Sequence, residues 1–357
     1  MLRVIIRRSR DISYLRDDRG EEIEGVREGP APWWIRGGGD VGRPDDVARV
    51  LSTTGRSSVV GYDLIVAAPR PISILVALAP EHAGAVVAAH RRAVAGALGY
   101  LEERALVVRD RRGGEERDLA GRWSHVVGFT HGVNRHGEPH LHDHVLVGAR
   151  PAGASVVLDS RALYAHGAAA DALYRCTLRA EVARTTPFVP WRSFEGVEHV
   201  QGLDEGYRVL WGGHHPDRGV KRHWSREDAR AAWSRDIARF EPHGARRSPV
   251  ARVDELNEHA FAAAFEGRDL VARRHVVAAW ANAAVFGADA ASVSASVDHW
   301  YPELRDSRGV HEGLIGVRTA RMVEVTRHGA RPLHVEDLER WRQRSRERSR
   351  EGLERSR

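Results

Sequence analysis

The sequence predicts an α+β fold in which an antiparallel β-sheet carries helices on one face, followed by a smaller, mainly helical C-terminal segment. Two observations predict it. Short runs of strand-forming residues, separated by turn residues, fill most of residues 104–158, and two long helical patterns flank them at 81–103 and 160–186. Consecutive strands combined with a few long helices favour a sheet whose helices lie together on one face.

The first elements are two strands and a helix. Residues 2–6 (LRVII) and 58–67 (SVVGYDLIVA) are rich in strand formers, and the Gly-, Pro- and charge-rich stretch 17–46 between them predicts an irregular segment. Pro80 fits the first turn of the helix predicted over 81–103. The apolar residues of this helix fall at helical spacing on one face: Val87, Val94, Leu98 and Leu101.

Four short apolar runs predict the rest of the sheet. They are residues 104–109, 123–130, 141–149 and 154–158. The residues that separate them favour turns: Gly113, Gly114, Gly137 and Pro139. The second long helix, over 160–186, follows directly.

Residues 1–240 are predicted to form one large domain. Its last elements are a strand near 196–200 and a helix near 225–239. A linker is predicted over 241–254, where Gly, Pro and Arg are frequent.

A small helical domain is predicted over 255–339. Residues 271–286 form its best helix, with Gly287 as the expected C-cap. The last stretch, 340–357, predicts a charged helix or a disordered basic tail.

The positive charge of the chain is concentrated at its C-terminal end. The sequence pI is about 9.9 and the net charge is +6. Residues 340–357 hold eight arginines against three glutamates and so carry five of these six charges. The net charge of the larger domain is therefore weak evidence for a nucleic-acid partner, and any basic face there must be local.

Several protein classes are not indicated by the composition. No apolar run reaches the roughly 18 residues that a membrane span needs, and the N-terminal residues do not form a signal peptide. Cys176 is the only cysteine, so no internal disulfide can form. No G-x-x-x-x-G-K-[ST] sequence occurs, which argues against a P-loop ATPase. We expect a cytoplasmic protein.

The densest chemical signal lies at residues 131–144, which read HGVNRHGEPHLHDH and hold five of the 20 histidines. His142 and His144 are two residues apart on a predicted strand, so their side chains lie on the same face. A hairpin would return His131 next to His142. Three neutral nitrogen ligands with open positions are typical of a catalytic metal site. His136 and His140 are expected to lie around the site or at the surface.

Two stretches together resemble a known family. Residues 61–73 (GYDLIVAAPRPIS) and 129–144 (FTHGVNRHGEPHLHDH) are similar to motifs of the TrwC-type (MobF) conjugative relaxases, in the HUH endonuclease superfamily. The helix beginning SRALYAHGAAADALYRCTLRAEV is similar too. The resemblance covers about residues 1–240, and residues 255–340 resemble, more loosely, the small helical region that follows the relaxase domain in larger members.

The resemblance implies a metal-dependent enzyme that nicks one DNA strand at a transfer origin. In that family a tyrosine attacks the scissile phosphate and stays linked to the 5′ phosphate. The metal ligands would be His131, His142 and His144, and Asp63 would be the carboxylate that supports them. We expect Mg²⁺ or Mn²⁺, although three histidines would also accept Zn²⁺ or Ni²⁺.

The expected nucleophile is Tyr14. It is the only tyrosine before Tyr62, and Leu15 follows it where the family has a tyrosine pair. A single tyrosine permits one covalent link at a time. Arg70 and Arg135 are candidate contacts for single-stranded or hairpin DNA. Because the sequence contains no helicase motif, we expect either that a separate helicase unwinds the DNA or that the sequence is part of a longer gene product. Coupling or secretion proteins are further candidate partners.

Two alternatives remain open on the sequence. A relaxase-like protein that binds DNA without nicking it would keep the fold and lose the nucleophile. A three-histidine hydrolase acting on a small molecule would share the metal ligands.

Overall fold

The computed structural model describes the chain in several stretches. They are residues 1–11, 33–36, 50–51, 58–110, 117–123, 126–152, 157–193, 195–212, 224–241, 244, 246–247, 272–300, 323–326 and 329–332. Tyr14 and the basic tail at 340–357 lie outside the described residues, as does most of the expected linker at 241–254.

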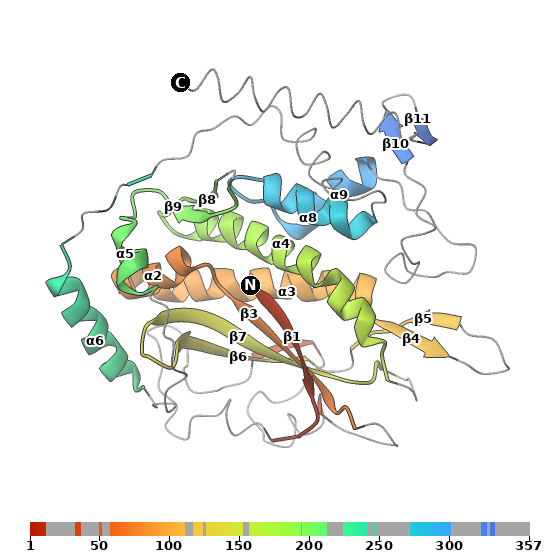
Figure 1. The fold of residues 1–357 in the computed structure, drawn as a ribbon, viewed down its shortest axis with the longest axis horizontal. Coiled ribbons are helices and arrows are strands. Elements are labelled where there is room, and N and C mark those ends of the chain that lie inside the picture. Colours follow the sequence, from red (N-terminus) through yellow and green to blue (C-terminus); the bar gives the residue numbers. More distant parts are fainter. Residues whose placement is uncertain are drawn as a thin grey trace.

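A five-stranded antiparallel sheet forms the centre of the fold (Figure 1). Its order is β1-β3-β7-β6-β2, so β7 lies in the middle. The strands are β1 (Leu2–Arg7), β2 (Trp33–Arg36), β3 (Gly61–Ala67), β6 (Val126–Val133) and β7 (Pro139–Gly148). The expected strands at 2–6, 58–67, 123–130 and 141–149 all fall within or overlap this sheet.

Two long helices cover one face of the sheet (Figure 1). They are α3 (Ala83–Ala105), which follows the short 3-10 helix η2 (Pro80–His82), and α4 (Ser160–Thr185), whose N-cap Asp159 accepts a hydrogen bond from the Arg161 amide. Their apolar faces and the alternate residues of the strands form the main core. The predicted fold class and both predicted helices are therefore confirmed.

The opposite face of the sheet has a smaller apolar cluster. It consists of Val50, Leu51, Val60, Val127, Phe129 and Leu146. In β7, Val145 and Val147 belong to the main core while Leu146 belongs to this cluster, as the two-residue period of a strand requires. The two faces of β7 thus have different neighbours along its whole length.

Two of the predicted sheet strands pair elsewhere. Residues 104–109 contribute to β4 (Val107–Asp110), which pairs with β5 (Arg117–Ala120) in a separate hairpin. From the run 154–158, Leu158 forms an isolated bridge with Val108. Closing a hairpin over a short loop costs less chain entropy than pairing with a distant strand, which explains why β4 pairs locally.

Shorter elements surround one end of the sheet. The helix α2 (Arg70–Leu78) follows β3, and the hairpin of β8 (Pro190–Arg192) and β9 (Glu198–Val200) follows α4. The helices α5 (Gly206–Leu210) and α6 (Arg226–Arg239) come next. The predicted strand at 196–200 and the predicted helix at 225–239 are present.

Two described C-terminal helices pack on α4. They are α8 (Arg273–Ala283) and α9 (Ala290–Trp300), and a hairpin of β10 (Val323–Thr326) and β11 (Gly329–Pro332) contacts α9. Val276, Val277 and Val293 belong to the same core as the sheet. The described part of the expected domain at 255–339 thus shares a core with the sheet and its two long helices, and the boundary at 241–254 stays a prediction.

Gly287 allows α4 and the C-terminal elements to approach closely. It follows α8 with φ +86°, and a Cβ there would lie 2.2 Å from the carbonyl oxygen of Cys176 on α4. The C-cap itself is Ala284, not Gly287 as expected from the sequence. Among the described helices, no single one is long and apolar enough to cross a membrane; α2 together with Pro80–Ala105 passes that test only as a pair bent by 110°.

Candidate metal centre

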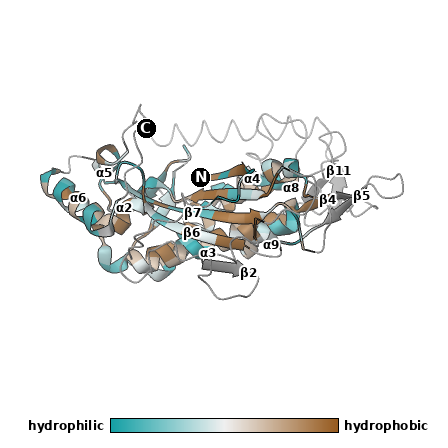
Figure 2. Cartoon of the chain, turned by 90° about the horizontal axis from the view of Figure 1, so that it is seen from below, coloured by the Kyte–Doolittle hydropathy of each residue, from teal (hydrophilic) through white to brown (hydrophobic). Residues whose placement is uncertain are grey.

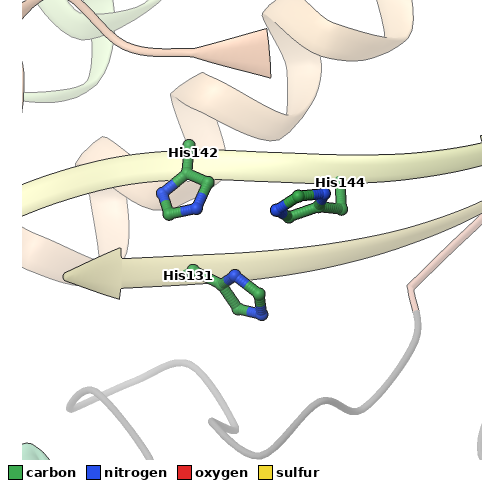
Figure 3. A group of neighbouring side chains, drawn as sticks. All are labelled: His131, His142 and His144. Carbon is green, nitrogen blue, oxygen red and sulfur yellow. The ribbon is translucent and has the colours of Figure 1, made fainter. Parts of the chain in front are cut away.

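Three histidines meet on the sheet face that α3 and α4 leave uncovered. His131 comes from β6, and His142 and His144 come from β7. The strand register places His131 opposite His142 and Phe129 opposite His144, so all three side chains point to the same face. Their ring centroids are 5.1 to 5.4 Å apart, and one nitrogen of each ring lies within 4.8 Å of the others (Figure 3).

The polarity of the two strands changes where these histidines begin. Half of β6 and half of β7 are hydrophobic, and the other halves are hydrophilic (Figure 2). The apolar halves anchor the strands between the two apolar clusters. The histidines are therefore presented at the end of a rigid, well-packed sheet, which suits a site that must hold its geometry.

The tautomer of His142 is set by the backbone. Its Nδ1 lies 2.8 Å from the carbonyl oxygen of His140, and because a carbonyl only accepts, Nδ1 must donate a proton. Burial holds the pKa of His142 well below its ordinary value, and the neighbouring His140 and His131 lower it further. His142 is thus neutral at pH 7 with Nε2 free to bind a metal.

The tautomer of His144 is set by a carboxylate from the next strand. Its Nδ1 lies 3.0 and 3.1 Å from the two carboxylate oxygens of Asp63, a buried residue of β3. Nδ1 donates to this carboxylate, which leaves Nε2 of His144 as the ligand atom. A carboxylate behind a histidine fixes the ring orientation and makes the free nitrogen a better ligand.

The other two histidines of the segment take different places. The His140 ring lies 4.7 Å from that of His142, but its nitrogens are not in the converging group. Burial lowers the pKa of His140 to about 4, and the nearby Arg70 adds to this shift. His136 is exposed in the turn after β6. The positions of both agree with the expectation that they surround the site.

The two candidate DNA-contacting arginines lie at the same end of the sheet. Arg70 begins α2 and donates a hydrogen bond of 3.0 Å to the carbonyl oxygen of Pro139, at the start of β7. Its guanidinium also lies 3.6 Å from Glu138. Arg135 is exposed in the turn between β6 and β7. Arg70 is thus fastened beside His140, whereas the side chain of Arg135 faces solvent.

The turn between β6 and β7 is held by two tryptophans that the sequence did not single out. Trp233 of α6 donates a 2.7 Å hydrogen bond to the carbonyl oxygen of Gly137, and Trp224 donates to that of Arg135. Gly137 has φ +81°, and a Cβ there would lie 2.5 Å from the Trp224 ring. The sequence signal at this turn was Gly137 with Pro139 two residues later, which predicts a turn but does not indicate a tryptophan partner.

The donor set fits a divalent metal ion. Two of the three histidines have Nδ1 on a fixed acceptor, so Nε2 is the nitrogen that each of them presents to a metal. A tightly held metal ion needs several ligand atoms close together. Among the described residues, His131, His142 and His144 are the side chains whose ligand atoms converge in this way. Three neutral nitrogens leave further positions for water or substrate oxygens, as in catalytic sites.

Solved structures with the same fold are conjugative relaxases. A metal-bound structure of the conjugative relaxase TrwC in complex with oriT DNA matches with a TM-score of 0.53 and 19% identity, covering 67% of this chain and 98% of that one. A metal-free structure of TrwC with oriT DNA matches with a TM-score of 0.50 and 20% identity, over the same shares of the two chains. This chain therefore has the relaxase fold, with three histidines on its open face.

A family model gives the more specific assignment. The TrwC relaxase model matches residues 16–213, which is more than half of the chain. The chain belongs to the TrwC relaxase family. No curated protein matches it.

Proposed function

We propose that this chain is a metal-dependent DNA relaxase that nicks one strand at a transfer origin. The observation that carries the proposal is the convergence of His131, His142 and His144, with Asp63 behind His144. Membership of the TrwC relaxase family supports it. So does the shared fold with relaxases solved in complex with oriT DNA.

The metal would be held by Nε2 of His142 and His144 together with a ring nitrogen of His131. A bound divalent cation would polarise a non-bridging phosphate oxygen and offset charge in the transition state. Asp63 orients His144, and the carbonyl oxygen of His140 orients His142. Mg²⁺ and Mn²⁺ are the ions we expect, and one related relaxase structure is copper-bound, which agrees with the affinity of imidazole for softer ions.

We propose Tyr14 as the nucleophile. A phenol has a pKa near 10, so it needs a base or a cation to react at neutral pH. None of the five described tyrosines is placed at the three histidines. Tyr62, Tyr100 and Tyr174 are buried in the main core, Tyr164 lies 50% exposed on α4, and Tyr207 stacks on Trp211. Attack by the Tyr14 oxygen on the scissile phosphorus would form a 5′-phosphotyrosyl bond and release the 3′ oxygen.

The proposed DNA substrate is single-stranded or hairpin DNA. Arg70 lies beside the site and Arg135 on the adjoining turn, where both can contact phosphates. The basic tail at 340–357 would add affinity that does not depend on sequence. A separate helicase, and coupling or secretion proteins, would complete the transfer of a plasmid or integrative element from the cytoplasm.

A covalent capture assay tests this function. The full chain would be incubated with Mn²⁺ and a pool of random single-stranded DNA, and DNA that stays attached in detergent would be sequenced. We expect an adduct with a shared cleavage sequence, lost in Tyr14→Phe and in His144→Ala. Tyr164→Phe is the matched control, since Tyr164 is exposed on the helix that covers the other face of the sheet.

Each other outcome has a definite meaning. DNA binding without any adduct would contradict nicking and favour a relaxase-like DNA-binding protein. An adduct that persists in Tyr14→Phe would show another nucleophile. Metal binding with neither DNA binding nor an adduct would contradict the proposal and favour a hydrolase of small molecules.

A further inference from the structure

A buried carboxylate lies directly between two of the metal-site histidines. Asp143 separates His142 from His144 on β7, and its side chain points to the opposite face, under α3 and α4. It is 0% exposed, and neither carboxylate oxygen has a hydrogen-bond partner of normal geometry. The neighbouring residues on that face, Leu141 and Val145, are apolar. A carboxylate at this position is costly and calls for an explanation.

The group that faces Asp143 comes from α3. His90 is also 0% exposed, and its Nε2 lies 3.2 Å from Oδ1 of Asp143. Its Nδ1 lies 2.7 Å from the hydroxyl of Tyr174 on α4. Three polar groups from β7, α3 and α4 therefore form one chain inside an otherwise apolar core.

The direction of this chain follows from the carboxylate. Burial, with the charge of Asp143 adding to it, raises the pKa of Tyr174 well above its ordinary value, so its hydroxyl keeps the proton and can donate or accept. Because a carboxylate only accepts, we assign a proton to Nε2 of His90, which lies 3.2 Å from Oδ1 of Asp143 without hydrogen-bond geometry. With that assignment Nδ1 of His90 is the acceptor and the Tyr174 hydroxyl is the donor.

We propose that Tyr174, His90 and Asp143 form a positioning relay that holds β7 in place behind the metal ligands. Adjacent residues of a strand share peptide planes and project to opposite faces. Fixing the side chain of Asp143 therefore fixes the backbone from which His142 and His144 both project. Metal sites tolerate errors of only about 0.2 Å in ligand distance, so small movements of β7 would weaken binding.

The cost of burial favours this role over a purely structural one. Replacing a buried polar pair as a whole by apolar residues of similar volume is often neutral or stabilising, so stability alone does not explain why Asp143 and His90 face each other in the core. The relay also has a natural control in the same two helices. Tyr100 of α3 makes a 2.8 Å hydrogen bond with His166 of α4. Both tyrosine–histidine pairs join α3 to α4, and the pair of Tyr174 and His90 also faces Asp143 on the ligand strand.

The test compares Tyr174→Phe with Tyr100→Phe in the full chain. Mn²⁺ affinity would be measured by titration calorimetry and thermal unfolding by circular dichroism. Substituting a group that hydrogen-bonds a metal ligand typically weakens metal affinity by 10- to 100-fold. The relay acts one step further from the metal, so we expect Tyr174→Phe to bind Mn²⁺ about tenfold more weakly. Tyr100→Phe should bind as the unaltered chain does. Equal Mn²⁺ affinity in the two variants would overturn the proposal.

Two substitutions at Asp143 keep the proposal testable if Tyr174→Phe folds poorly. Asp143→Val should weaken Mn²⁺ binding, and it should also lower the melting temperature because it leaves Nε2 of His90 buried opposite an apolar side chain. Asp143→Asn keeps a carbonyl acceptor for His90 and should retain most of the affinity. If Asp143→Val bound Mn²⁺ like the unaltered chain, the relay would be refuted.

The inference rests on the proposed metal site, and the two fail differently. If the unaltered chain binds no Mn²⁺, both the metal site and the relay are contradicted. If it binds Mn²⁺ and all four variants bind equally, the relay alone is wrong.

Discussion

Asp63→Asn is the substitution whose effect follows most directly from the geometry. The Asp63 carboxylate accepts from Nδ1 of His144 through both oxygens, at 3.0 and 3.1 Å, and the residue is 2% exposed. A hydrogen bond to a charged group contributes about 1.5–3 kcal/mol, against about 0.5–1.5 kcal/mol for a neutral one. The amide can still accept from Nδ1, so the loss should be about 1–1.5 kcal/mol, or about tenfold in metal affinity.

Asp63→Ala removes the acceptor altogether. The His144 ring is then free to rotate or to exchange tautomers, and the expected loss is about 100-fold, the upper range for groups behind metal ligands. Both variants would be titrated with Mn²⁺ by calorimetry. Asp159→Asn is the control, because it removes one negative charge at the start of α4 and asparagine still caps a helix. The reasoning would be refuted if Asp63→Ala bound Mn²⁺ as tightly as Asp159→Asn.

Three further predictions concern pH, the β6–β7 turn and the tail. The pKa of His140 is about 4 in the folded state and near 6.5 when unfolded, so the unfolded chain takes up a proton first as the pH falls, and stability should drop by about 2 kcal/mol between pH 7.5 and 5. Urea unfolding checks this, and His140→Gln should remove that share of the pH dependence. Gly137→Ala should destabilise the chain by about 1–3 kcal/mol, because Gly137 has φ +81° and a Cβ there would meet the Trp224 ring. Gly167→Ala is the control and should be neutral or stabilising, because a Cβ at Gly167 on α4 would meet open space. Equal melting temperatures of the two variants would contradict this prediction. Deleting 340–357 should reduce the salt dependence of single-stranded DNA binding by about 0.7 in log–log slope for each phosphate that the tail neutralises, and an unchanged slope would exclude the tail from DNA binding.

The triad could be predicted because its geometry is local. His142 and His144 share a face by the period of a strand, and the β6–β7 hairpin has few residues in its turn. The contact between Asp63 and His144 joins residues 81 positions apart. No local pattern fixes that pairing, and the resemblance to relaxases supplied it.

The buried relay could not be predicted for a similar reason. His90, Asp143 and Tyr174 lie on three elements, and only their packing brings them together. An acidic residue at an inward position of β7 was the one sequence signal available. Likewise, residues 104–109 read as a sheet strand because composition distinguishes strands from turns but does not say which strands pair.

The metal centre is tested most directly by the position of a bound ion. Crystals of the full chain grown with Mn²⁺ would be measured for anomalous scattering at the manganese edge. We predict one ion bonded to His131 and to Nε2 of His142 and His144, with Nδ1 of His144 still facing Asp63. An ion bound through Nδ1 of His142 or His144, or manganese found only away from the three histidines, would contradict the proposed centre.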